Sequence, residues 1–206
     1  MPLIPDFSAQ YPELTVDLLL TDTVVDLFAD RIDLAIRLGL LEDSTLIAQQ
    51  LMKTHYRVCA SPTYLQRCGQ PQQPSDIEHH NCLLFPLSGY RSRWIFQDGD
   101  GVTSEIPVLG NVLISNAVAL QQCAIAGMGL ALLPNWLIDN DLKAGHLINV
   151  FPTYQVTATD FNTSVWLVYP SRTYVPLKVR VLIEFLKQWM PQIKGDLSCP
   201  FSGSIL

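Results

Sequence analysis

Residues 115–134 read SNAVALQQCAIAGMGLALLP, which predicts a capped helix followed by a buried strand. Ser115 and Asn116 are good N-cap residues for the helix that their alanine- and glutamine-rich continuation predicts. The Gly-Met-Gly sequence at residues 127–129 ends that helix, because glycine adopts the left-handed C-cap conformation at low cost. The apolar run after it, closed by Pro134, predicts a fully buried strand.

Residues 108–114 also predict a strand, so the order is strand, short helix, strand. That order implies parallel pairing of the two strands and a right-handed crossover. Ser115 and Asn116 then lie at the carboxyl end of a strand, which is where open α/β sheets bind ligands. Helix capping alone would also account for both residues, since many capped helices bind nothing.

A second strand–helix–strand unit is predicted near the start of the chain. Residues 14–20 and 32–38 predict its two strands. Between them, a helix over residues 23–30 would be capped by Thr21 and Asp22. These caps are likewise expected at the carboxyl end of a strand.

The rest of the chain predicts short strands and helices, with an Asp-Gly hairpin at residues 98–101. Further strands are expected over residues 46–60 with a break near 53–54, and over 82–85, 94–96, 102–108, 147–150 and 165–169. Further helices are expected at residues 1–11, 136–142 and 176–190, a short helix is expected to begin at residues 64–65, and residues 156–162 are expected to form a loop. Pro191 is expected to end the last helix, with a flexible tail over residues 192–206.

Composition excludes several classes of protein. The chain has 206 residues, of which 49% are hydrophobic, and a net charge of −6. It can bury a sizeable core, but no apolar run is long enough to span a bilayer. The acidic balance argues against direct binding to nucleic acid, because phosphate contacts need clustered Lys and Arg. The five cysteines favour buried free thiols in a reducing cytosol, with one redox pair as the alternative.

The chain carries no signature of an enzyme, a metal site or a cofactor site. It contains neither a Gly-x-Ser-x-Gly elbow nor a Walker loop, and the acidic hairpin loop lacks the further carboxylates of a calcium site. We therefore expect no catalytic residues, no cofactor and no metal. An enzyme would need an acid–base pair, for which Asp22 and Arg37 are the candidates.

Short motifs along the chain carry a family resemblance. They are YPE at 11–13, DLAIRLG at 33–39, ASPTYL at 60–65, GQP at 69–71, PSDI at 74–77, HNCL at 80–83, AGMGLALLP at 126–134 and YPSR at 169–172. Each is weak alone, but in this order, over roughly 180 residues, the set is specific. Together the motifs resemble the effector-binding domain of LysR-type transcriptional regulators.

The resemblance implies an α/β fold of two Rossmann-like lobes joined by two crossover strands, as in type II periplasmic binding proteins. Lobe I would comprise residues 1–59 and 165–191. Lobe II would comprise residues 60–164, and residues 192–206 would form the tail. The first strand of lobe I is expected to be absent from this chain, which would leave an exposed sheet edge.

The resemblance also implies a small effector in the cleft between the lobes. Helix N-termini suit anionic groups, so we expect an effector that carries a carboxylate, although Asp22 and the negative net charge count against it. The expected ligand-binding residues are Thr21, Asp22, Arg37, Ser61, Phe85, Ser115, Asn116 and Ala117.

Further expectations concern partners. Members of the family bind promoter DNA through an N-terminal winged helix-turn-helix, which is not in this chain. They pair side by side, so we expect a cytoplasmic homodimer, extended to a tetramer in the full-length protein, with no membrane contact. The helices at residues 24–28 and 136–142 are candidate dimer surfaces. A solute-binding protein for transport is the alternative with the same fold, and an upstream secretion signal would identify it.

Overall fold

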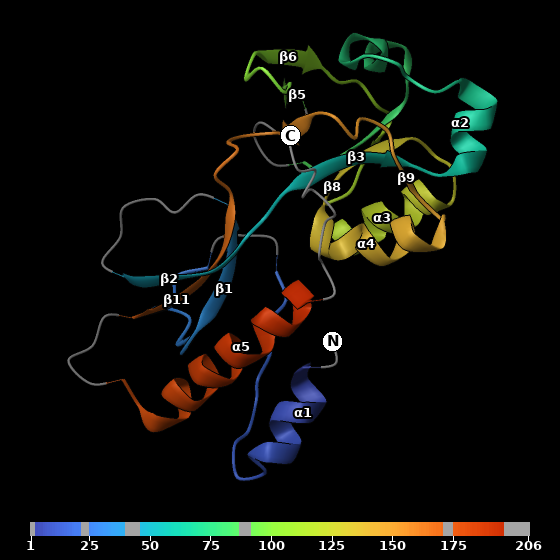
Figure 1. Cartoon of the computed structure of the whole chain (residues 1–206). Coiled ribbons are helices and arrows are strands. Elements are labelled where there is room, and N and C mark those ends of the chain that lie inside the picture. Colours follow the sequence, from blue (N-terminus) through green and yellow to red (C-terminus); the bar gives the residue numbers. More distant parts are fainter. Residues whose placement is uncertain (1–2, 22–24, 40–45, 87–91, 171–174, 196–206) are drawn as a thin grey trace, which may run out of the picture. The chain divides into compact units, whose positions relative to one another are not determined.

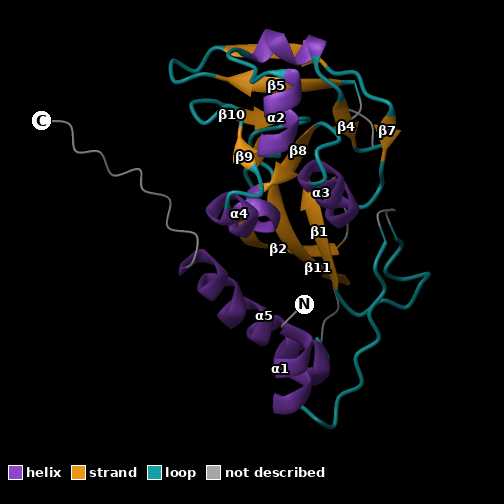
Figure 2. Ribbon diagram, turned by 90° about the vertical axis from the view of Figure 1, so that its right-hand side faces the viewer, coloured by secondary structure: helices purple, strands orange, loops and turns teal. Residues whose placement is uncertain are grey.

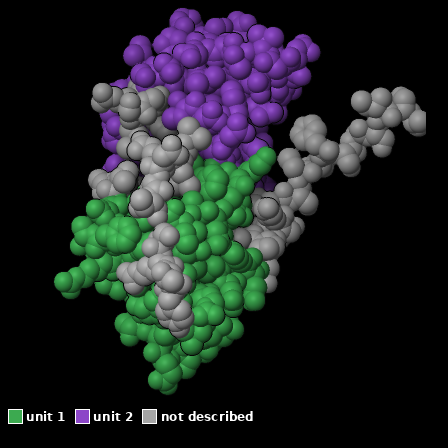
Figure 3. Space-filling model, turned by 90° about the vertical axis from the view of Figure 1, so that its left-hand side faces the viewer, with its two compact units in different colours: residues 1–53, 164–206 green, residues 54–163 purple. Residues whose placement is uncertain are grey.

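The computed structural model describes residues 3–21, 25–39, 46–86, 92–170 and 175–195 (Figure 1, Figure 2). The chain divides into two compact units, which are described in turn. Unit 1 comprises residues 1–53 and 164–206, and unit 2 comprises residues 54–163 (Figure 3).

Unit 1 is a three-stranded antiparallel sheet with one long helix packed on it. Its elements are α1 (Leu3–Gln10), β1 (Ala35–Gly39), β2 (Leu46–Lys53), β11 (Ser164–Pro170) and α5 (Leu177–Gly195). The strand order β1-β11-β2 makes β11 the central strand. Apolar side chains of α5, such as Ile183 and Leu186, pack against Leu167 of β11. Helix α1 lies beside α5, with the ring centroids of Phe7 and Phe185 5.1 Å apart (Figure 1).

Unit 2 is built on one mixed sheet. Its strands are β3 (Tyr56–Ala60), β4 (Cys82–Leu84), β5 (Arg93–Gln97), β6 (Thr103–Pro107), β7 (Val112–Leu113), β8 (Leu130–Pro134), β9 (Ile148–Asn149) and β10 (Gln155–Thr157). Its helices are α2 (Pro62–Cys68), the 3-10 helix η1 (Pro74–His79), α3 (Ala117–Ile125) and α4 (Asn135–Ala144). The strand order is β6-β5-β10-β3-β8-β4-β7, and β9 pairs with β3.

The core of unit 2 has two halves, one on each face of the sheet. All five residues of β8 are buried, as expected of a strand covered on both faces. Because side chains alternate along a strand, Leu132 packs in the cluster with Trp94, whereas Leu133 packs in the cluster with Leu120 and Ile138. Helices α3 and α4 therefore cover the same face of the sheet (Figure 2). The predicted helix after Asn116 and the predicted buried strand are both confirmed.

The two strands that flank α3 are parallel in direction but are not neighbours. Strand β4 lies between them and pairs in parallel with both β7 and β8. The prediction of direct pairing is wrong, because the partner that fills the gap comes from elsewhere in the chain. Strand β7 is also shorter than predicted, since residues 108–111 pass the start of β4 with the Cys82 amide donating to the Leu109 carbonyl at 2.9 Å.

The strand predicted over residues 14–20 does not form. No described strand pairs with this segment, and Leu18, Leu19 and Leu20 are 49%, 62% and 74% exposed. Alternating or apolar sequence favours an extended chain, but a strand exists only when another strand accepts its hydrogen bonds. Strand β1 lies at the edge of the sheet, with Ile36 and Leu38 about half-exposed.

The helix predicted over residues 23–30 is also wrong for the described residues 25–30. They form a turn in which Asp26 Oδ1 accepts the amides of Phe28 at 2.9 Å and Ala29 at 3.2 Å. Leu27 is buried and Phe28 is exposed, so the two do not form one apolar helix face. Aspartate competes for nearby amides in this way, which favours turns over helices. Over its described residues 25–28, the candidate dimer helix is therefore not formed.

Two further elements differ from expectation. Residues 156 and 157, predicted as the start of a loop, belong to β10, which lies between β3 and β5 with Val156 opposite Tyr56 and Phe96. Helix α5 continues past Pro191 to Gly195, so the prediction that Pro191 ends it is wrong. Proline lacks only one backbone N–H donor, and the helix continues with that one hydrogen bond missing. Residues 196–206 of the predicted tail lie outside the described residues. The hairpin at residues 98–101 and the helix predicted at residues 136–142 are confirmed.

The cysteines of unit 2 include two buried free thiols. Burial raises the pKa of both Cys59 and Cys82 to about 12. A thiol with so high a pKa stays protonated near neutral pH and is a poor nucleophile. Cys199 lies outside the described residues, and Cys68 is exposed.

Candidate functional site

Unit 2 brings two predicted site segments to one edge of its sheet. Phe85 directly follows β4, and Ser115 follows β7 by two residues. The two strands run in parallel and are joined beyond their ends by the Ile114 amide, which donates to the Leu84 carbonyl at 2.9 Å. Phe85 is half-buried, whereas Ser115 and Asn116 are exposed. An aromatic side chain and a helix N-terminus thus lie together at the carboxyl ends of the parallel strands.

The N-terminus of α3 carries amides that can bind an anion. Asn116 is the N-cap, and its Oδ1 accepts the Ala119 amide at 3.0 Å. Within the described part of the chain, the amides of Ala117 and Val118 have no acceptor. The helix dipole places positive partial charge at the same point. This helix end can therefore donate two hydrogen bonds to a carboxylate or another anion.

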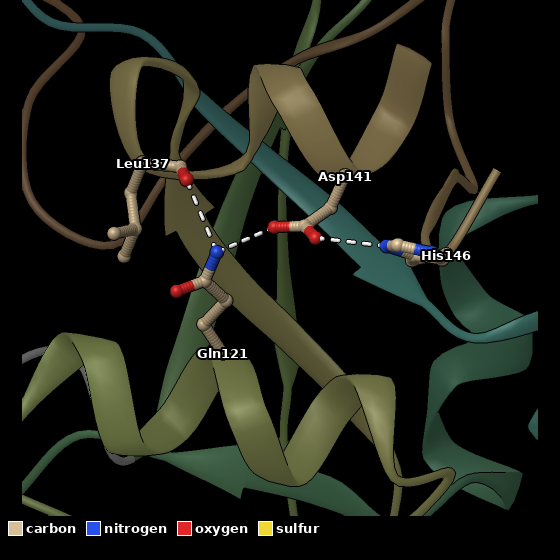
Figure 4. Close-up of polar contacts among 4 residues, drawn as sticks. All are labelled: Gln121, Leu137, Asp141 and His146. Atoms are coloured by element: carbon tan, nitrogen blue, oxygen red, sulfur yellow. Dashed lines mark hydrogen bonds and ion pairs between the residues drawn. The ribbon is translucent and has the colours of Figure 1, made fainter. Parts of the chain in front are cut away.

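Polar contacts join α3 to α4 and hold its position (Figure 4). The side-chain amide of Gln121 donates to the Leu137 carbonyl at 3.1 Å and to Asp141 Oδ2 at 2.5 Å. Asp141 Oδ1 lies 3.3 Å from Nδ1 of His146. Gln121 is buried, so its two hydrogen bonds offset the cost of removing the amide from water. These contacts tie α3 to α4 one turn after the N-terminus of α3.

Ser61 does not lie with the other predicted residues of unit 2. Strand β3 runs antiparallel to β8, so its carboxyl end lies at the opposite edge of the sheet from Phe85 and Ser115. Ser61 is buried and its Oγ accepts the Tyr64 amide at 3.2 Å as the N-cap of α2. Its position gives it a structural role in capping α2.

The predicted residues of unit 1 are described in part. Arg37 lies on β1, and its guanidinium donates to the Val25 carbonyl at 2.8 Å, which anchors the turn after residue 24. Thr21 is exposed, and Asp22 lies outside the described residues. A guanidinium has five N–H donors, so Arg37 keeps others for a ligand.

Sequence reasoning missed the Gln121, Asp141 and His146 cluster, because their contacts cross between helices. It also missed Gln49, a polar residue between Ile47 and Leu51 on β2, although its place in an apolar alternation was a readable signal. Among the described residues, no group of three or more His, Cys, Asp or Glu is arranged to hold a metal. Within the same ranges, no helix combines the length and apolarity that crossing a bilayer requires.

Comparisons with known proteins agree on one family. The family model described as "LysR substrate binding domain" matches residues 1–191. An uncharacterised HTH-type transcriptional regulator of Haemophilus influenzae is 33% identical over 180 residues, covering 86% of this chain and 60% of that protein. The HTH-type transcriptional activator TtdR of Escherichia coli K12 is 33% identical over 195 residues, covering 94% of this chain and 61% of that protein.

A solved structure extends the likeness to the fold. The regulatory domain of CrgA, a LysR-type transcriptional regulator of Neisseria meningitidis, superposes with a TM-score of 0.80 at 30% identity. The match covers 92% of this chain and 90% of that domain. It confirms the predicted fold class, the α/β architecture of type II periplasmic binding proteins. The chain spans about 60% of the length of the curated relatives it matches.

Proposed function

Because the chain belongs to the family of LysR substrate-binding domains, we propose that it binds a small anionic effector at the N-terminus of α3. The family is non-enzymatic, and the chain is an effector-binding regulatory domain of the LysR type. Its effector is proposed to be an organic acid, with the carboxylate accepting the free amides of Ala117 and Val118. The whole regulator would bind promoter DNA through its helix-turn-helix domain.

The observation that carries this proposal is the pair of free amides at the end of an anchored helix. A helix N-terminus that only caps itself uses its N-cap side chain, as Asn116 does here, and leaves its other amides to water. In α3 the free amides follow β7, and the half-buried residue Phe85 follows the neighbouring strand β4, so both lie past the carboxyl ends of parallel strands, where α/β folds bind ligands. An aromatic carboxylate would contact both groups at once.

In unit 1, Arg37 is a separate candidate group for binding an anion. The guanidinium of Arg37 already donates to the Val25 carbonyl in the turn. A carboxylate bound to the remaining N–H donors of Arg37 could therefore change the position of that turn. An effector can shift a regulatory equilibrium only as far as its affinities for the two states differ. We propose that this shift reaches the DNA-binding domain through a cytoplasmic homodimer, assembled further as a tetramer in the full-length protein, with α4 as one candidate contact surface.

A thermal-shift screen of small carboxylates tests this proposal. We expect at least one aromatic or aliphatic acid to raise the melting temperature in proportion to the logarithm of its concentration, because ligand binding stabilises the folded state by mass action. The matching primary alcohols, which lack the carboxylate, should have no effect. Equal shifts with acids and alcohols would contradict an anion site.

A further inference from the structure

We propose that unit 1 holds a second ligand site, between its sheet and α5, that binds a free α-amino acid with an aliphatic side chain. The site is a hollow of about 360 Å³ whose lining includes Gln49, Tyr169, Arg180, Ile183, Glu184 and Lys187. This volume lies within the range of small-molecule sites. The hollow belongs to unit 1 alone and is independent of the helix N-terminus proposed above for the effector.

The first observation is the buried side-chain oxygen of Gln49, a residue that is itself half-buried. Gln49 follows Ile47 and precedes Leu51 on the face of β2 that packs against α5, where the pattern calls for an apolar residue. Its Nε2 donates to the Tyr169 hydroxyl at 2.8 Å. Its Oε1 is buried and has no hydrogen-bond partner among the described residues. An unsatisfied buried acceptor destabilises the fold, so a role in binding a donor group would explain its presence.

The second observation is the set of donors and charges around that acceptor. The Tyr169 hydroxyl accepts from Gln49, so its own proton remains available for a ligand. Arg180, Glu184 and Lys187 follow one another at helical spacing on one side of α5, and no ion pair joins them within the described structure. The hollow therefore presents two cations and a hydroxyl donor beside one carboxylate and one neutral acceptor.

These groups are complementary to a zwitterion. The carboxylate of an α-amino acid would accept from Arg180, Lys187 and the Tyr169 hydroxyl, since charge-assisted hydrogen bonds are the stronger kind. The ammonium group would pair with Glu184, and a rotation of the Gln49 side chain would bring its unpartnered Oε1 to the same group. An aliphatic side chain would lie on Ile183, which is buried in the wall of the hollow. A simple anion would leave both Gln49 Oε1 and Glu184 without a partner.

Binding of L-leucine to the full chain, followed by calorimetry and thermal shift, tests the proposal. Two matched probes each lack one charge: 4-methylpentanoate has no ammonium group, and 3-methylbutylamine has no carboxylate. We expect each to bind at least about tenfold more weakly than leucine, because each loses all the charge-assisted contacts of the missing group. Equal affinity for all three probes, or no binding of leucine at about 10 mM, well above the 1 mM scale of weak ligands, would overturn the proposal.

A double variant separates loss of leucine binding from loss of folding. Gln49→Leu with Tyr169→Phe replaces both hydrogen-bonding partners with apolar groups of similar shape, which leaves stability unchanged or raises it. We expect this variant to melt no lower than the parent and to lose leucine binding. Arg180→Gln should weaken binding, whereas Arg93→Gln, which removes one exposed charge from the hairpin of unit 2, should not. Leucine binding that is retained in the double variant would overturn the proposal. Loss of leucine binding in Asn116→Asp, which alters only the effector site, would also overturn it.

Discussion

Replacing Gly110 with alanine is expected to lower the free energy of unfolding by at least about 3 kcal/mol, the upper part of the range for overpacked cores. A Cβ atom on Gly110 would lie 1.7 Å from the carbonyl oxygen of Cys82 and 2.8 Å from its carbonyl carbon. Both are backbone atoms at the buried start of β4, so no side chain can move aside. The chain must shift, which would break the hydrogen bond from the Cys82 amide to Leu109.

Urea unfolding of Gly110→Ala beside Gly99→Ala measures this effect. Gly99 lies in the hairpin turn and does not have a positive φ. A Cβ atom added there would have no neighbouring atom within 4 Å. We expect the control variant to change stability by no more than about 0.5 kcal/mol, as exposed substitutions usually do. Equal unfolding midpoints for the two variants would show that residues 108–111 do not pass β4 as described.

The second large effect is expected on effector binding. Asn116→Asp keeps an oxygen that can cap the Ala119 amide, and aspartate caps a helix as well as asparagine does. The new carboxylate interacts favourably with the helix dipole, so the fold should be as stable as the parent. It also places a negative charge beside the free amides of Ala117 and Val118. We expect the affinity for a carboxylate effector to fall roughly tenfold to a hundredfold through charge repulsion.

Asn140→Asp is the matched control for this charge change. Asn140 is exposed on α4, away from the first turn of α3, and the variant has the same net charge as Asn116→Asp. Its affinity for the acid should equal that of the parent, apart from a small long-range term that added salt screens. An equal loss in both variants would indicate a general effect of net charge.

Local sequence predicted those elements that local sequence controls. The buried run Leu130–Pro134, the helix after Asn116 and the Asp-Gly hairpin all depend on burial, capping or turn chemistry within a few residues. Residues 14–20 failed as a strand because a strand needs a partner, and no local pattern supplies one. Residues 155–157 became a strand for the converse reason, since β3 and β5 lie on either side of them.

The candidate site was predictable to the same extent. Asn116 could be recognised as a cap, because asparagine before an apolar helical pattern is a strong signal. The position of Ser61 could not be predicted, because the end of the sheet at which it lies depends on β3 pairing antiparallel with β8. Gln121 and Asp141 are 20 residues apart, so their hydrogen bond follows only from the packing of α3 on α4. The contacts that anchor α3 therefore could not be predicted from local sequence, because they form only in the tertiary structure.

Backbone amide chemical shifts of the ¹⁵N-labelled chain, recorded during titration with the carboxylate that stabilises it most, would locate the bound effector. We expect the amide signals of Ala117 and Val118 to move furthest, because these amides donate to the bound carboxylate. The amide of Ala119, already bonded to Asn116, should move less. Saturable binding that leaves Ala117 and Val118 unchanged would contradict the proposal that the N-terminus of α3 binds the effector.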